Sequence, residues 1–366
     1  MNVKTATIPP GSHTPVAPPA RGKTTGMFIA LLGLLALAVL AGISLGSVNV
    51  APDIVATVLA AKVLPAGWLD VSMVSDADSV IVWLIRTPRV LVAALVGAGL
   101  ALAGVQMQGL FKNPLASPDI VGTSAGGAFG AVLAIACGLA ARSLFYVPLL
   151  AFLGAMMALF AVYAIAMQRG RTPVATLLLA GIALNALFGA ATSLVISLQF
   201  VTYQVAQEIV FWLMGGLDSR TWMHVGIVAP CVVGGVIIAC AFTRDLDVLL
   251  LGEETAASLG VDVEHVKHVM FTSAALVTGA AVAVSGVIGF VGLVVPHIVR
   301  LLLGPAHRRL LPASALAGAS FVILADLLAR TLIRPEEIRL GIITAACGAP
   351  FFLYLLLTRN GETTTM

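Results

Sequence analysis

Long apolar segments recur along this 366-residue chain, and they limit what it can fold into. The first is residues 27–46, in which Ser44 is the single polar residue. A helix needs about 20 such residues to cross a bilayer, and only helices and closed barrels satisfy their own backbone there. The alternating pattern of a membrane barrel is absent, and 60% of the residues are hydrophobic. The sequence therefore predicts an all-α polytopic membrane protein.

Ten transmembrane helices can be placed between the turns and polar segments. They are expected at about residues 27–46, 80–107, 118–138, 144–167, 174–198, 222–242, 268–286, 288–303, 310–329 and 338–358, with Pro296 breaking the eighth. Residues 47–79 are predicted to lie outside, and residues 199–220 to form a short outer helix at the interface. The chain would then consist of a disordered N-terminal tail (1–26), a ten-helix domain (27–358) and a C-terminal tail (359–366).

The charge of the N-terminal tail indicates the orientation of these helices. Its basic residues favour a cytoplasmic N-terminus, and ten spans return the C-terminus to the same side. A basic start before an apolar run is also typical of a signal peptide, but the length of residues 27–46 favours a retained span. Both termini are therefore expected in the cytoplasm.

Three arginines on the predicted outer side, Arg86, Arg89 and Arg330, each lie at the end of a span. One interpretation is that they anchor the span ends by reaching towards the interface. The other is a docking ring that binds acidic side chains of an extracytoplasmic partner. Asp326 is the only carboxylate well inside a predicted span, and it precedes Arg330 by four residues. This spacing favours a local ion pair over a proton relay.

Residues 245–267 carry six of the 17 carboxylates of the chain and cannot lie in lipid. Gly252 precedes Glu253 and Glu254, and acidic residues suit the first turn of a helix. Gly260 is positioned to end that helix. Between them Ala256, Ala257 and Leu259 give it a small apolar face, which suits docking into a cleft of a soluble protein. The alternative is an ordinary helix in a surface loop.

Motifs for catalysis, nucleotide binding or metal binding are missing from the sequence. Residues 122–130 are rich in glycine but lack the Gly-Lys-Ser/Thr ending of a phosphate-binding loop. Their glycines recur every four residues, which favours close helix packing in lipid. His297 could be a haem ligand, but a structural role is favoured, and the four isolated cysteines suit packing positions. No catalytic, cofactor-binding or metal-binding residue is predicted, and a net charge of +3 gives no case for nucleic-acid binding.

Seven ordered motifs resemble the permease subunits of bacterial ABC importers for iron–siderophore complexes, haem and vitamin B12, the FecCD-type group. The resemblance covers nearly everything after the N-terminal tail. The motifs are RTPR at 86–89, MQGLFKNPLA at 107–116, LLLAG at 177–181, FWLMGG at 211–216, GEE to LG across 252–260, GFVGLVVPH at 289–297 and ADLLAR at 325–330.

The resemblance implies a function, a set of partners and a set of site residues. The chain would be a permease in the bacterial inner membrane, paired with a second copy of itself as a homodimer or with a homologous permease as a close pseudo-dimer. A separate ATPase subunit would bind ATP and Mg and receive the cytoplasmic coupling segment, residues 248–262. A periplasmic binding protein would deliver the cargo and dock on the outer arginines. The implied site residues are, for docking, Arg86, Arg89 and Arg330; for ATPase coupling, Gly252, Glu253, Glu254, Ala256, Leu259 and Gly260; and for the inner gate, Asn113, Pro114, Leu115, Val174 and Ala175.

The cargo implied by the resemblance is an iron chelate, either a ferric siderophore or haem, with vitamin B12 as the alternative. At the second gate some relatives carry small hydroxyl residues, where this chain has Val174 and Ala175. From another class, an ion-coupled secondary transporter would require several carboxylates inside the membrane, and only Asp326 qualifies. An intramembrane enzyme would need a polar cluster at that depth, which the sequence does not show.

Overall fold

The computed structural model describes residues 21–65, 68, 70, 74–167, 172–198 and 203–360, and in these parts regular structure is helical throughout. Seven helices are long and apolar enough to cross a membrane, and three shorter apolar helices occupy the third, eighth and tenth predicted spans. The all-α membrane fold is thus confirmed. The elements are α1 (Arg21–Ser44), α2 (Pro52–Val63), α3 (Asp76–Ser79), η1 (Val80–Arg86), α4 (Thr87–Leu110), η2 (Pro118–Val121), α5 (Thr123–Ala136), α6 (Tyr146–Ala166), α7 (Val174–Leu198), α8 (Tyr203–Leu213), α9 (Trp222–Ala241), α10 (Thr243–Leu249), α11 (Glu253–Ser258), α12 (Val263–Ser285), α13 (Val291–Leu303), α14 (His307–Ala329) and α15 (Leu340–Asn360).

Some predicted boundaries are wrong. Helix α1 begins at Arg21, so residues 21–26 are helical, and residues 1–20 of the expected tail lie outside the described residues. Helix α15 extends to Asn360, and residues 361–366 lie outside the described part. Helix α13 runs through Pro296 without a break. The proline costs one backbone hydrogen bond, and buried neighbours on α13 hold the helix together around it.

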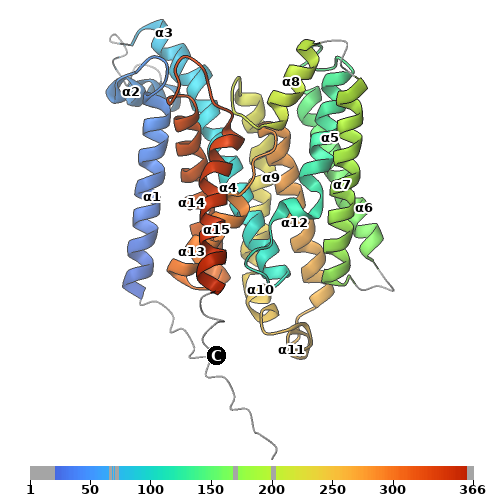
Figure 1. Ribbon diagram of the computed structural model, residues 1–366. Helices are drawn as coiled ribbons and strands as arrows, with labels where there is room; N and C mark the ends of the chain where they lie inside the picture. The colour runs from blue at the N-terminus through green and yellow to red at the C-terminus, as the bar shows by residue number, and fades with distance from the viewer. Residues whose placement is uncertain are drawn as a thin grey trace, which may run out of the picture.

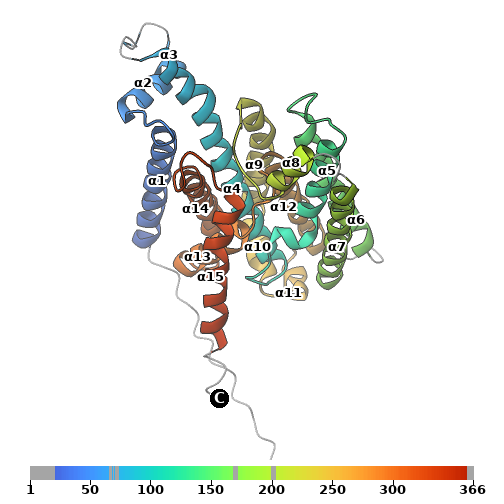
Figure 2. The same ribbon diagram turned by 45° about the horizontal axis from the view of Figure 1, so that its top comes forward.

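The bundle has two distinct ends (Figure 1). Helices α10 and α11 lie at one end, together with the start of α1 and the end of α15, while α2, α3 and α8 lie at the other. The turned view keeps this arrangement and shows α4 running between α14 on one side and α12 on the other (Figure 2). We call the α10–α11 end the inner end and the α2–α8 end the outer end.

Helix α4 is the central column, and glycines let its neighbours approach it closely. A β-carbon on Gly97 would lie 2.1 Å from the carbonyl oxygen of Gly318 in α14, and one on Gly104 would lie 1.8 Å from that of Gly292 in α13. Gly126 of α5 meets Gly154 of α6 in the same way, at 2.5 Å. Backbones in direct contact stabilise helix pairs in lipid by dispersion forces. The predicted small-residue packing is therefore confirmed.

The start of α4 contains a π-helical turn, and Pro88 gives a physical reason for it. In an α-helix the proline ring would clash with the carbonyl four residues earlier. The preceding element η1 is π-helical, and Thr87 donates to the carbonyl of Val82, five residues earlier, through its N–H and, at 2.7 Å, through its Oγ1. The wider turn continues the helix past the proline.

Candidate functional site

The expected coupling segment, residues 248–262, contains a six-residue helix, α11, between two glycines with positive φ. Gly252 precedes α11 with φ +119° and Gly260 follows it with φ +85°, a region that side chains with a β-carbon rarely adopt. Glu254 and Leu259 are exposed, and Leu259 retains 59% of its surface. Ala256 is fully buried in the chain's own core. Ala256 therefore anchors α11 to the bundle, while Ala257 and Leu259 of the expected docking face stay exposed.

A buried lysine ties α11 to the helices behind it. Lys267 is 3% exposed, and its Nζ lies 2.7 Å from Glu253 of α11 and 3.1 Å from Glu264 of α12. Glu264 in turn accepts hydrogen bonds from the N–H and Oγ1 of Thr172, at 3.0 and 2.6 Å. Since Thr172 lies two residues before α7, the chain of contacts reaches from the coupling helix to the expected second gate.

An apolar cluster makes the same connection. Ala256 belongs to a buried cluster that also contains Phe111 and Ala116, on either side of the Asn113-Pro114-Leu115 turn. Val174 packs against this cluster from the start of α7. The turn itself is held by Asn113, whose Oδ1 accepts the N–H of Leu115 at 3.0 Å. The structure thus brings both expected gate segments and α11 around one cluster, with Ala175 exposed at its edge.

Helix α10 has a separate attachment to the bundle. The backbone N–H of His307, at the start of α14, donates to Asp247 at 2.9 Å, and its ring Nδ1 lies 2.6 Å from the same carboxylate oxygen. His307 is fully buried. Among the described residues, α11 is therefore joined to α12 through Lys267, and α10 is joined to α14 through Asp247 and His307.

The three outer arginines lie at the end of η1, at the start of α4 and just after α14, and each has acceptors within the chain. Arg86 is 6% exposed and donates to the carbonyls of Ile43 and Ser44, at 2.8 and 2.9 Å, and of Val48. These carbonyls at and just beyond the end of α1 lack helical partners. Arg86 thus caps α1 in this structure.

Asp326 lies between the other two arginines. Arg330 is 3.4 Å from it and also donates to the carbonyl of Gly42, so the predicted pair within α14 is confirmed. The shorter contact, however, is with Arg89, whose guanidinium lies 2.8 Å from Asp326 and 2.9 Å from Glu337. Local spacing predicts only the first pair, because Arg89 and Asp326 are 237 residues apart. Among these groups, Glu337 is the exposed one.

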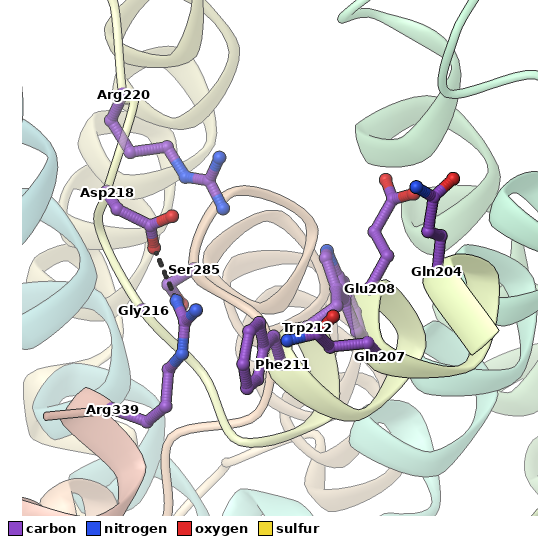
Figure 3. A pocket seen from close by; sticks show the side chains of 10 residues that line it. All are labelled: Gln204, Gln207, Glu208, Phe211, Trp212, Gly216, Asp218, Arg220, Ser285 and Arg339. Carbon is purple, nitrogen blue, oxygen red and sulfur yellow. Dashed lines mark hydrogen bonds and ion pairs between the residues drawn. The ribbon is translucent and has the colours of Figure 1, made fainter. Parts of the chain in front are cut away.

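A pocket that the sequence analysis did not single out opens between α8 and the loop leading to α9 (Figure 3). Its volume is 390 Å³. The guanidinium groups of Arg220 and Arg339 lie on one side, Gln204 and Glu208 lie on the other, and the ring of Phe211 lies near Arg339. The signal that could have found it is the mixed segment around the Phe211-Trp212 pair, followed by an arginine in an outer loop.

Comparisons with known proteins agree with this architecture. The model of the FecCD transport family matches residues 34–358. A cobalamin import system permease of Halobacterium salinarum is 49% identical over 290 residues, covering 78% of this chain and 76% of that protein. A hemin transport system permease of Yersinia pestis is 40% identical over 289 residues, covering 77% and 84%.

A solved structure gives the same result for the fold. It is described as an inward-facing conformation of a metal-chelate type ABC transporter, and it superposes with a TM-score of 0.79 at 31% identity. The superposition covers 91% of this chain and 99% of that one. Because the family model spans most of the chain and the curated relatives are similar over most of their own lengths, the chain belongs to the FecCD transport family.

Proposed function

We propose that this chain is the permease subunit of an ABC importer that moves an iron chelate, a ferric siderophore or haem, inward across the inner membrane of a bacterium. The observation that carries the proposal is the agreement with the metal-chelate type ABC transporter over 99% of that chain. The hemin permease of Yersinia pestis supports haem as cargo. A second candidate cargo is cobalamin, favoured by the 49% identity to the Halobacterium permease.

The partners follow from this proposal. A second copy of the chain forms the other half of the translocation path, a periplasmic protein delivers the cargo, and a separate ATPase subunit holds ATP and Mg. The start of α1, the end of α15 and α11 lie at one end of the bundle, which supports cytoplasmic termini on the same side as the ATPase (Figure 1).

The contacts at the inner end support a route for the transport movement. Closure of the ATPase pair would displace α11, which is held by Lys267 and by the burial of Ala256. Both attachments reach the start of α7, and the apolar cluster also reaches the turn after α4. Packed elements with two discrete arrangements can transmit such a displacement to a gate. In contrast, Asp326 is held by two arginines, which does not suit an ion-coupled carrier.

The test of the proposed function is transport by the complete importer in proteoliposomes. The permease, its ATPase and its binding protein are reconstituted, and uptake of haemin, a ferric siderophore and cyanocobalamin is measured with and without ATP. ATP-dependent uptake of haemin or the siderophore is expected. Uptake of cyanocobalamin alone would favour the second candidate, and uptake of any chelate without ATP would contradict the ABC mechanism.

We expect the binding protein to dock at the outer end through Arg89, where an acidic side chain would replace Glu337. Glu337 is the exposed partner of Arg89, whereas Arg86 and Arg330 are buried on internal acceptors. Glu337→Gln removes the competing charge, so docking should tighten about threefold, the scale of an exposed ion pair. The measurement is binding-protein affinity for the permease–ATPase complex in nanodiscs.

The matched control is Glu336→Gln, which changes the charge of the adjacent exposed residue. Equal effects of the two variants would show that docking responds to the overall charge of the loop and not to the contact between Arg89 and Glu337. Weaker docking of Glu337→Gln would show that the binding protein does not take over its place at Arg89.

A further inference from the structure

The outer pocket is built by parts of the chain that are distant in sequence. Its lining comes from α8, the loop before α9, the last residue of α12 and Arg339, which directly precedes α15. Backbone hydrogen bonds fix this junction: Gly216 donates to Ser285 at 2.8 Å, and Leu340 donates to Gly215 at 3.1 Å. The pocket is therefore a preformed cavity at a junction of four elements.

Arg220 lies at the wall of this cavity and is partly buried. No hydrogen bond or ion pair of its guanidinium is found within the described part of the chain, and its Nε is buried. Burial lowers the pKa of Arg220, and the charges of Arg89 and Arg339 lower it further against the opposing effect of Asp218. An arginine nevertheless remains charged at neutral pH. Asp218 acts on Arg220 through its charge but forms no ion pair with it among the described residues, so an anion that enters the pocket would be stabilised by the guanidinium.

The neighbouring charges do not supply that anion. Asp218 is bound to Arg339, with 3.0 Å between the carboxylate oxygen and the guanidinium. Glu208 lies across the cavity on α8, beside Gln204 (Figure 3). The cavity is thus polarised, with free positive charge on the side of the α9 loop and acceptor groups on the side of α8.

The remaining lining indicates what else the ligand would carry. Phe211 is 40% exposed, and the guanidinium of Arg339 stacks over its ring at 4.1 Å from the centroid. Gly216 leaves room beside the ion pair, because a β-carbon there would lie 2.9 Å from Asp218 Oδ1. The volume of 390 Å³ lies at the lower end of the usual range for small-molecule pockets. It admits a small chelate or one arm of a larger one.

We propose that this pocket is a cargo subsite on the outer side of the permease, and that Arg220 binds a carboxylate group of an anionic metal chelate there. The planar guanidinium can form two parallel hydrogen bonds to a carboxylate, which a neutral chelate cannot accept with equal strength. The inference rests on the proposed function, since it names the chemical class of the cargo that enters the permease from the outer side. It requires no residue of α11 or of the inner gate.

The test is direct binding to the full-length permease in lipid nanodiscs, without ATPase or binding protein. Two probes are compared by equilibrium dialysis with radiolabelled iron: ferric citrate, which carries carboxylates, and a neutral ferric trihydroxamate. Arg220→Gln should raise the Kd for ferric citrate about tenfold, which is the usual effect of one charge-assisted hydrogen bond. The same variant should leave the Kd for the trihydroxamate unchanged. Arg220→Lys keeps the positive charge but cannot form the two parallel hydrogen bonds, so its Kd for ferric citrate should lie between those of the wild type and Arg220→Gln.

Arg142→Gln is the matched control, because Arg142 is exposed in the connection between α5 and α6, away from the cavity. It should bind ferric citrate as the wild type does. The proposal is overturned if the wild type shows no saturable binding of ferric citrate, or if Arg220→Gln and Arg142→Gln lower the affinity for ferric citrate equally. It is also overturned if Arg220→Gln lowers the affinity for ferric citrate and for the trihydroxamate by the same factor. Failure of the proposed function would appear separately, as absence of ATP-dependent uptake by the complete importer.

Discussion

Asp326→Ala is expected to destabilise the protein by about 3–5 kcal/mol, the cost of removing one partner from a buried ion pair. Asp326 is 1% exposed, and its carboxylate is shared by Arg89 and Arg330. Without it, two guanidinium groups stay close together inside the bundle. The measurement is the unfolding equilibrium in mixed detergent micelles, where the variant should unfold at a clearly lower denaturant fraction.

The physical cause can be separated from simple loss of packing. The double variant Arg89→Leu/Asp326→Leu removes one buried cation together with the carboxylate, and it should be less destabilised than Asp326→Ala. Glu336→Ala, at an exposed position near by, should unfold like the wild type. If Asp326→Ala also matched the wild type, the three-way contact would have no role in stability.

Leu259→Asp is expected to weaken association with the ATPase at least about 30-fold, because a carboxylate would be buried without a partner in the docking cleft. Leu259 directly follows the short helix α11, and its side chain is mostly exposed in the isolated chain. The substitution should therefore leave the fold intact. Affinity for the ATPase is measured by surface plasmon resonance on nanodisc-embedded permease.

Val63→Asp is the control for this experiment. Val63 is 81% exposed at the end of α2, at the outer end of the bundle, and it receives the same change from an apolar side chain to a carboxylate. It should bind the ATPase with wild-type affinity. If Leu259→Asp retained that affinity while remaining folded, α11 would not be the ATPase contact.

The positions of the spans and of α11 could be predicted because local physics determines them. Long apolar runs must be helical in lipid, and Gly252 and Gly260 bracket a short polar helix. Contacts between distant segments could not be predicted in this way. The spacing of Arg330 and Asp326 indicates their pair, but nothing near Arg89 in the sequence indicates that Asp326 is also its partner.

The roles of individual side chains were least predictable where a helix departs from regular geometry. Arg86 and Arg89 share a face in an ideal α-helix, but Arg86, the last residue of the π-helical η1, donates to a carbonyl at the end of α1, whereas Arg89 binds Asp326 of α14. Likewise, a short apolar face on α11 does not reveal that Ala256 is buried in the chain's own core. That Arg220 lines a cavity and makes no ion pair with another described residue can be recognised only from the folded loops around it.

The backbone contacts of α4 have a consequence for how the protein tolerates change. A single methyl group at Gly104 would overlap the carbonyl oxygen of Gly292, whereas nothing lies within 4 Å of the corresponding point at Gly189 in α7 or Gly226 in α9. Laboratory evolution of this permease should therefore accept large apolar replacements on its periphery and reject even alanine along its axis. In such a library, the smallest residues would mark the positions where sequence variation is most restricted.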